Sequence, residues 1–125
     1  GIIAQRLLRR LCVHCREQVQ VQAGSAEARI LGAEHVGRTI YQHHSGGCDA
    51  CDYQGYKGRL AIMELLRFDA ELDELITRNA TLGELNAHAL AKGFVPIAED
   101  GLRRVLEGIT SIEEVGSVVV LNVHL

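Results

Sequence analysis

The pattern of apolar and polar residues changes near the middle of the chain. Residues 1–66 carry short apolar stretches separated by polar and glycine-containing turns. Residues 67–116 instead carry apolar residues three and four positions apart, which is the spacing of helices. The pattern predicts an α+β fold in which a small lobe with short strands is followed by a small helical bundle.

The first eleven residues have apolar positions at helical spacing. Ile3, Leu7, Leu8 and Leu11 recur along this stretch, and arginines fill most of the other positions. No capping residue precedes the run. We therefore predict that residues 1–11 form a helix that continues from a preceding domain and packs against it. A free amphipathic helix is the alternative.

Helix and strand signals alternate between residues 12 and 66. Ser25 is a typical helix N-cap and Gly32 a typical terminator, which together predict a short helix between them. Residues 38–42 and 60–66 have the composition of strands.

Start and stop signals of helices recur in residues 67–116. Capping residues or an early proline mark the starts, and asparagine or glycine marks the ends. These signals predict helices over 70–79, 81–93 and 96–108 and a short fourth helix, beginning at Asp69, Thr81, Pro96 and Ser111. Their leucine and valine stripes are predicted to form the core of a bundle that packs against the N-terminal lobe.

Residues 117–125 form an atypical apolar tail. Six of the last eight residues are apolar, and three of them are consecutive valines. This composition suits a strand added to a sheet or an exposed, adhesive end, and the tail could also be foreign to the natural protein.

Composition limits the functional classes. The chain has 125 residues, 47% of them hydrophobic, and a formal net charge of −3. A slightly acidic chain of this size is typical of a soluble globular domain and disfavours a nucleic-acid partner, because phosphate-backbone binders carry a basic excess. No apolar run approaches the roughly 20 residues that span a bilayer, which disfavours direct membrane insertion.

The four cysteines are the strongest chemical signal. They form two pairs with two-residue gaps, Cys12 with Cys15 and Cys48 with Cys51, and 32 residues separate the pairs. Two such turns facing each other supply the four thiolates of a closed tetrahedral zinc site. We therefore predict that these four residues bind structural Zn(II) and stabilise the lobe formed by residues 12–66.

Four other interpretations of the cysteines stay open. Two disulfides would suit a small oxidised scaffold, but this chain is long enough for a core and shows no signal peptide. A redox-active pair would need to open a helix after a strand. A rubredoxin-like iron carrier uses similar pairs but a compact aromatic core, whereas this chain has five aromatic residues. A nucleic-acid-binding zinc ribbon is supported by the basic residues near Cys12.

Other candidate sites are weaker. Residues 32–39 resemble a phosphate loop with arginine in place of lysine, but they lead into a predicted strand rather than a helix. His14, His43 and His44 lie near the cysteines, yet four thiolates already complete the tetrahedron. His88 has no partner at ligand spacing. Catalytic residues are therefore not predicted in this chain.

Basic residues flank both cysteine pairs. A zinc ion bound by four thiolates carries a net charge of about −2. We predict that the flanking cations offset this charge or are simply solvated; they are Arg6, Arg9, Arg10, Arg16, Lys57 and Arg59.

Three separated segments carry a family resemblance. They are QRLLRRLCVHC (residues 5–15), GCDACDYQGYKGRLAIMELL (47–66) and AEDGLRRVLEGITSIEEV (98–115). In this order they closely resemble the C-terminal part of the type II secretion and type IV pilus assembly ATPases, the secretion-pathway protein E type of traffic ATPase. The likeness covers almost everything from Gln5 to Val115.

The resemblance implies a cytoplasmic hexameric motor that docks on inner-membrane secretion platform proteins. The family's ATP and Mg(II) sites belong to a core upstream of Gly1, so residues 1–11 would continue from that missing core. Residues 12–66 would be the zinc lobe, with Cys12, Cys15, Cys48 and Cys51 as ligands, and residues 67–116 the C-terminal helical lobe. The sequence departs from the family at Leu60-Ala61 and after Val115.

Overall fold

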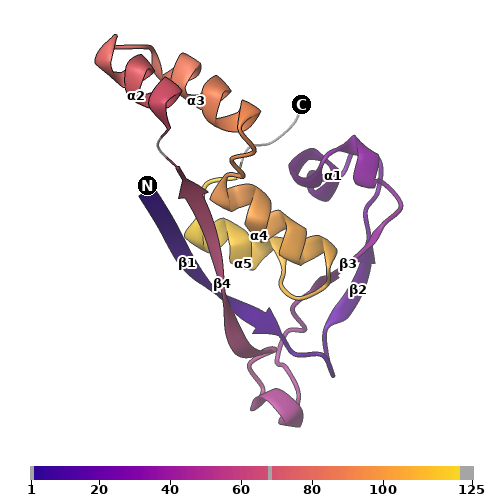
Figure 1. Cartoon of the computed structure of the whole chain (residues 1–125). Coiled ribbons are helices and arrows are strands. Elements are labelled where there is room, and N and C mark those ends of the chain that lie inside the picture. The colour runs from indigo at the N-terminus through magenta and orange to yellow at the C-terminus, as the bar shows by residue number, and fades with distance from the viewer. Residues whose placement is uncertain (1, 68, 122–125) are drawn as a thin grey trace.

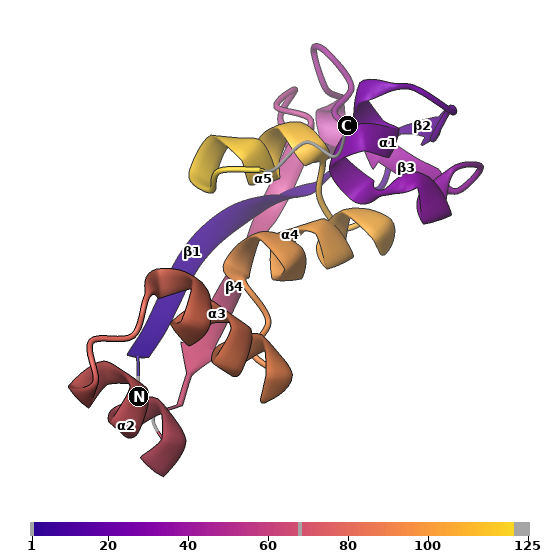
Figure 2. The same ribbon diagram turned by 90° about the horizontal axis from the view of Figure 1, so that it is seen from above.

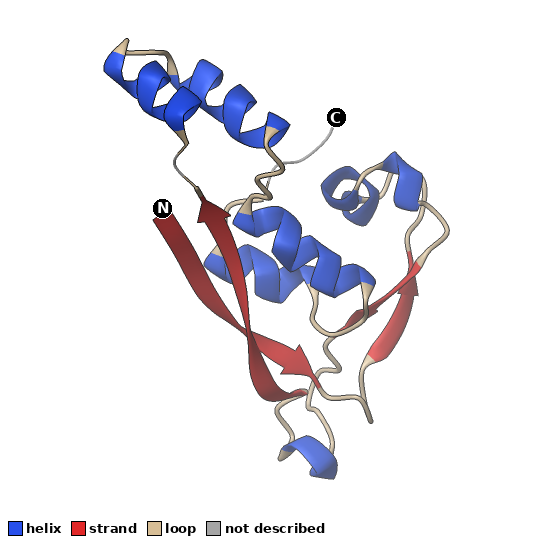
Figure 3. Cartoon of the chain, viewed as in Figure 1, coloured by secondary structure: helices blue, strands red, loops and turns tan. Residues whose placement is uncertain are grey.

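The computed structural model describes residues 2–67 and 69–121. These residues form helices and two small antiparallel sheets, so the predicted mixed α+β class is confirmed (Figure 1, Figure 3). In chain order the elements are β1 (Ile2–Leu11), β2 (Glu17–Gln20), α1 (Ala26–Leu31), η1 (Ala33–His35), β3 (Thr39–Gln42), η2 (Asp49–Cys51), β4 (Tyr56–Leu66), α2 (Ala70–Thr77), α3 (Leu82–Ala91), α4 (Ile97–Leu106) and α5 (Ile112–Val118).

The prediction of a helix over residues 1–11 is wrong, because this stretch forms strand β1. β1 pairs antiparallel with β4, with Leu8 opposite Leu60. Leu7 and Leu8 therefore lie on opposite faces of the ribbon: Leu8 is fully buried, and Leu7 is 58% exposed. The pairing partner lies about fifty positions along the chain, so local helical spacing gives no sign of it.

Most of the other predicted elements are confirmed. Ser25, Asp69, Thr81 and Ser111 cap α1, α2, α3 and α5, and each side chain accepts a hydrogen bond from a backbone N–H three residues further on. The predicted strand over 38–42 is β3, which pairs with β2. The strand over 60–66 is the second half of β4.

The helices do not form the predicted single bundle. α4 contacts β4, and α5 contacts both β1 and α4, so these two helices cover one face of the β1–β4 ribbon (Figure 1, Figure 2). α2 and α3 contact each other as a separate hairpin beyond the end of β4. Two-residue-period alternation in β1 and β4 creates the apolar face that α4 and α5 cover.

The main core lies between the ribbon and these two helices. Leu8 of β1, Ile62 of β4, Val105 of α4 and Val115 of α5 are all fully buried. The β2–β3 sheet and α1 contribute further buried side chains to the same cluster, namely Val21, Ala28, Leu31 and Ile40.

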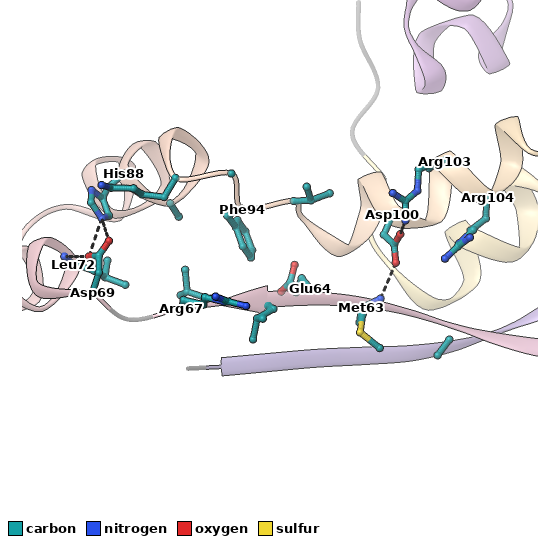
Figure 4. A pocket seen from close by; sticks show the side chains of 17 residues that line it. Met63, Glu64, Arg67, Asp69, Leu72, His88, Phe94, Asp100, Arg103 and Arg104 are labelled. Atoms are coloured by element: carbon teal, nitrogen blue, oxygen red, sulfur yellow. Dashed lines mark hydrogen bonds and ion pairs between the residues drawn. The ribbon is translucent and has the colours of Figure 1, made fainter.

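A cavity of about 800 Å³ separates the α2–α3 hairpin from α4. Two aspartates that line the cavity, Asp69 and Asp100, accept hydrogen bonds from neighbouring elements (Figure 4). Asp69 accepts from His88 Nε2 at 3.2 Å, a pair that spacing along the sequence did not reveal. Asp100 accepts from the Met63 N–H at 2.9 Å and pairs with Arg103 at 2.6 Å. The carboxylates of Asp69 and Asp100 are therefore engaged in hydrogen bonds within the fold.

The tail predicted over 117–125 is described as far as residue 121. Val118 ends α5, Val119 and Leu121 pack against the core, and Val120 is 89% exposed. Residues 117–121 therefore form neither an added strand nor a wholly exposed end, and residues 122–125 lie outside the described part. Among the helices of residues 2–67 and 69–121, none has the length and apolar character needed to cross a membrane.

Candidate metal centre

The four cysteine side chains meet where β1 ends and β4 begins. All four Sγ atoms lie within 4.8 Å of one another. The separation is 3.8 Å between Cys12 and Cys48, 3.9 Å between Cys15 and Cys51, and 3.8 Å between Cys48 and Cys51. Cys12 and Cys51 are buried, and the other two are partly exposed. The structure thus brings together all four predicted ligands.

Three of the sulfur separations match those expected in a tetrahedral metal site. A zinc–sulfur bond of about 2.3 Å places the corners of a regular tetrahedron about 3.8 Å apart. A disulfide would need a separation of about 2.05 Å, and all four cysteines are free thiols. The donor set therefore fits Zn(II) and does not fit the disulfide alternative.

Each pair lies on a tight turn, and a backbone hydrogen bond joins the two turns. In the first turn, Arg16 N–H donates to the carbonyl of Cys12 at 3.0 Å. Cys12 N–H in turn donates to the carbonyl of Gly55 at 3.0 Å, beside the second pair. A backbone hydrogen bond consequently joins the two turns, and their sulfurs lie close together.

Glycines shape the second turn. Gly47 has φ +60°, and a Cβ there would lie 2.4 Å from the Tyr53 carbonyl carbon, so the turn requires glycine at this position. Gly55 has φ +78°, and its N–H donates to Cys51 Sγ at 3.1 Å. Sequence analysis did not single out Gly55. The one sequence feature that could have indicated its role is its position four residues after the last cysteine.

Backbone donors and burial shift the thiol pKa values in opposite directions. The N–H groups of Cys48 and Gly55 lower the pKa of Cys51 to about 6. Burial raises the pKa of Cys15 to about 12 and also raises the pKa of Cys48. A metal that binds all four sulfurs must displace protons from the thiols with raised pKa values, so its affinity falls as the pH falls.

The nearby histidines have other partners. His43 Nε2 lies 2.9 Å from the Gln54 carbonyl, and His43 stacks on Tyr56 with ring centroids 4.9 Å apart. His44 pairs with Glu17. These contacts agree with the prediction that thiols, rather than imidazoles, form the ligand set.

A polar network connects the start of β4 to α5. Glu114 is buried, and it accepts from the Arg9 backbone N–H at 2.7 Å and from the Arg9 guanidinium at 2.8 Å. The same guanidinium lies 4.2 Å from the centre of the Tyr56 ring. The Tyr56 hydroxyl lies 3.0 Å from Ser111 Oγ, at the N-cap of α5. The residue that follows Gly55 is thereby fixed to a helix.

Several of the flanking cations have a structural role that sequence analysis missed. Arg16 donates to the carbonyl of Gly108 at 2.6 Å and lies 3.8 Å from the centre of the Tyr41 ring. Lys57 donates to the carbonyl of Ala50, inside the second turn, at 3.1 Å. Arg9 and Arg16 therefore join the cysteine region to the α4–α5 region, as well as adding positive charge near the sulfurs.

The segment that resembles a phosphate loop lacks the required context. Gly32 ends α1, η1 follows, and Thr39 opens β3. A phosphate loop instead follows a strand and opens a helix. The weak resemblance over residues 32–39 thus gives no support for nucleotide binding.

Comparison with known proteins identifies relatives along nearly the whole chain. The family model described as "Type II/IV secretion system protein" matches residues 1–117. The chain is 37% identical over 98% of its length to the type IV pilus assembly ATPase TfpB of Acinetobacter baylyi. It is 42% identical over 92% of its length to the type IV pilus assembly ATPase PilB of Thermus thermophilus, and 40% identical over 92% to the type II secretion system protein E of Pseudomonas aeruginosa.

These relatives are much longer than the chain, which spans 21%, 13% and 22% of their respective lengths. The family match covers β1 to α5 and includes both cysteine pairs and the Arg9–Glu114 network. Both the predicted resemblance and the match over residues 1–117 point the same way: the chain belongs to the Type II/IV secretion system protein family.

Proposed function

We propose that this chain is the C-terminal zinc-binding part of a secretion or pilus-assembly ATPase, in which the zinc has a structural role. The observation that carries the proposal is the cluster of four Sγ atoms, which all lie within 4.8 Å of one another and include three pairs at 3.8 to 3.9 Å. Four thiolates fill the coordination sphere of zinc, so a bound ion would polarise no water or substrate and would instead offset part of the negative charge of the four ligands and hold them together.

The chain's own residues then transmit the rigidity of this centre. Gly55 donates to Cys51, and Tyr56 reaches the N-cap of α5. Arg9, three residues before Cys12, is held by Glu114 of the same helix. Fixing the two cysteine turns would therefore fix the end of the β1–β4 ribbon relative to α5, which suits a part that passes on motion generated elsewhere.

The enzyme activity is proposed for the longer protein. The relatives are named as ATPases, and this chain matches about a fifth of their length or less. We place the sites for ATP and Mg(II) in a core ahead of β1, so that this chain alone is not an enzyme. The whole protein would act as a cytoplasmic hexamer on inner-membrane platform proteins, with neighbouring subunits as further partners.

Metal analysis tests the structural proposal. We expect one zinc per chain and no visible colour after purification under reducing conditions, and Co(II) replacement should give the absorption of a tetrahedral four-sulfur site. Cys51→Ser should lose these signals. His14→Ala, in the first turn but outside the cluster, is the matched control and should keep them. A metal-free wild-type chain would contradict the proposal, and a coloured iron protein would favour the electron-carrier alternative.

Hydrolysis and nucleic-acid assays test the assignment to a motor. The 125-residue chain should not hydrolyse ATP, whereas the longer protein should do so in a Mg(II)-dependent manner. The chain should also fail to shift DNA or RNA at low salt, where phosphate contacts are strongest. ATP hydrolysis by the isolated chain, or a salt-sensitive shift of nucleic acid, would argue against this assignment.

A further inference from the structure

The two helices of the α2–α3 hairpin leave most of their apolar side chains exposed. Among residues 70–91, all of which the structure describes, only Leu72 and Ala89 are buried. Leu82 is 73% exposed, Leu90 is 55% exposed and Ile76 is 48% exposed. Exposed apolar side chains that gather in one place mark an interaction site rather than an ordinary solvated surface.

These side chains line a groove of about 660 Å³, which we call the hairpin groove. α2 contributes Leu72 and Ile76, which are one helical turn apart. α3 contributes an apolar stripe that runs from Leu82 to Leu90. The stripe extends for about 12 Å along the helix axis, which is enough to contact two turns of another helix.

The shape of the hairpin groove suits a third helix. Its walls are helices whose interior backbone groups bond within each helix, so they offer no free sheet edge to a strand. An amphipathic helix instead places apolar residues from successive turns into such a groove. α2 has 8 residues and α3 has 10, fewer than the roughly 12 that an isolated helix needs in water, so a third helix would also stabilise the pair.

The charge of the hairpin indicates the charge of this helix. Residues 69–93 contain five acidic and two basic residues, a formal net charge of −3, which equals that of the whole chain. Among the described residues that line the groove, Glu64 is the one charged side chain. Asp73 is exposed and lies three positions before Ile76, on the same side of α2. Lysines or arginines beside the apolar stripe of a bound helix would therefore face carboxylates.

The same charge disfavours other occupants of the groove. A second copy of the chain would bring an equal negative charge to it, and like charges repel. Anionic lipid surfaces and nucleic acids are disfavoured for the same reason. A positively charged amphipathic helix is the occupant whose shape and charge both match the hairpin.

We propose that the hairpin groove binds a basic amphipathic helix of a partner protein. The apolar stripe of this helix would lie against Ile76, Leu82 and Leu90, and its cations would lie near Glu64 and Asp73. The hairpin follows the end of β4, whereas the second cysteine pair precedes its start, so the groove is separate from the candidate metal centre (Figure 1). The groove adds a protein-binding role to the proposed structural role of the chain.

Peptide binding to the 125-residue chain tests the proposal. The probe is a fluorescently labelled helical peptide in which leucines recur three and four positions apart and lysines fill the other positions. One control peptide has glutamate in place of lysine, and another has the same leucines and lysines in scrambled order. We expect the probe to bind with micromolar affinity at physiological ionic strength, measured by fluorescence anisotropy, and both controls to bind at least roughly tenfold more weakly.

Substitutions locate the bound peptide. Leu82→Gln should weaken binding by roughly tenfold, because it removes one apolar contact of the complex. Val13→Gln is the matched control, since Val13 is 69% exposed but lies in the first cysteine turn, and it should leave the affinity unchanged. Glu64→Gln keeps an acceptor for the Ile97 N–H and should weaken binding by about threefold, whereas Glu113→Gln on α5 should have no effect.

Four results would overturn the proposal. Failure to bind the lysine peptide, or equal binding of the glutamate peptide, would show that the groove does not select a basic helix. Equal affinities of Leu82→Gln and Val13→Gln would place the peptide elsewhere. Self-association of the chain that Leu82→Gln abolishes would assign the groove to a second copy. Binding by the 125-residue chain but not by the longer protein would show that the longer protein's own polypeptide fills the groove. Zinc content is measured on the same samples, so a failure of the proposed metal centre is recognised separately.

Discussion

The two ends of the β1–β4 ribbon are stabilised in different ways. At the cysteine end, comprising residues 9–15 and 48–59, backbone hydrogen bonds and a buried carboxylate hold the strands in place, and the four thiols cluster. At the open end, comprising residues 3–7 and 61–66, one face buries Ile62 against the helices, whereas the other face exposes Ile3, Leu7, Met63 and Leu65. The cysteine end thus has its partners within the chain, whereas the open end leaves one largely apolar face exposed within the described residues.

The difference shows how a short chain distributes stability. A ribbon of two strands is marginal alone and needs a covering layer or a cross-link. α4 and α5 provide the layer on one face, and the proposed metal centre provides the cross-link at one end. Stability should therefore be greatest near Cys12 and Cys51 and should fall toward Ile3 and Leu65.

The largest expected effect is the loss of the cysteine end after metal removal. Structural zinc contributes about 10 to 16 kcal/mol at neutral pH. That contribution is comparable with the whole stability of a small domain, about 5 to 15 kcal/mol. We expect a chelator under reducing conditions to abolish cooperative thermal unfolding, measured by circular dichroism, and Cys12→Ser to behave in the same way.

A control separates this effect from general damage to the turn. His14 lies between Cys12 and Cys15 and is exposed, so His14→Ala should keep the wild-type melting curve with and without chelator. If chelation leaves the melting curve of the wild-type chain unchanged, the cysteine end is stabilised by its hydrogen bonds alone and the contrast between the two ends does not depend on metal.

A smaller effect is expected when the buried carboxylate is removed. Glu114→Ala leaves the Arg9 N–H without its acceptor and removes the guanidinium's partner. The Arg9 side chain is 55% exposed, so water can solvate its charge, and we expect a loss of roughly 2 to 3 kcal/mol in the free energy of unfolding. Urea denaturation at pH 7 measures it.

Glu113 is the matched control for Glu114. It is the preceding residue of α5 and is exposed, so Glu113→Ala should change the free energy of unfolding by less than about 0.5 kcal/mol. Equal effects of the two substitutions would mean that the network from Arg9 to α5 adds little to the cysteine end.

Alanine substitution of two glycines compares the close packing of α4 on the ribbon with the looser packing of the α2–α3 hairpin. A Cβ at Gly101 of α4 would lie 2.8 Å from Val115 Cγ1 and 3.3 Å from Ile62 Cδ1. Gly101→Ala should therefore destabilise by about 1 to 3 kcal/mol, less its helix-propensity gain. At Gly83 of α3 the nearest atom is 3.8 Å away, so Gly83→Ala should stabilise by up to about 1 kcal/mol. Denaturant midpoints measure both, and a reversal of the two signs would contradict the packing described for α4.

The candidate site was largely predictable because its chemistry is local. Two cysteines two residues apart lie on one turn whatever the rest of the fold does, and four such thiols have few other uses. Helix caps such as Ser25 and Ser111 were predictable for the same reason, since each acts within three residues. Gly55 escaped notice because its contact with Cys51 depends on the exact path of the turn.

Long-range pairing accounts for what could not be predicted. Leu7 and Leu8 suit a helix as well as a strand, and it is pairing with residues near 60 that decides between them. Arg9 and Glu114 are 105 positions apart, so their contact has no local signature. The division of the helices into an α2–α3 hairpin and an α4–α5 layer also follows from which helices meet the ribbon, a choice that apolar stripes alone leave undetermined.

The smallest expected effect is a loss of stability at acid pH that is caused by protonation of Glu114. Burial by itself raises the pKa of Glu114, but hydrogen bonds from the Arg9 guanidinium and the Arg9 N–H outweigh it and hold the pKa below its usual value. The unfolded chain therefore binds this proton more readily than the folded chain. The stabilisation is complete above the unfolded pKa of about 4.3 and is lost as the pH falls through the lower folded pKa. Urea unfolding of wild type and Glu114→Gln between pH 3 and 7, at matched zinc content, should give two curves that converge toward acid. Curves that stay parallel would show that the carboxylate contributes no proton-linked stability to the cysteine end.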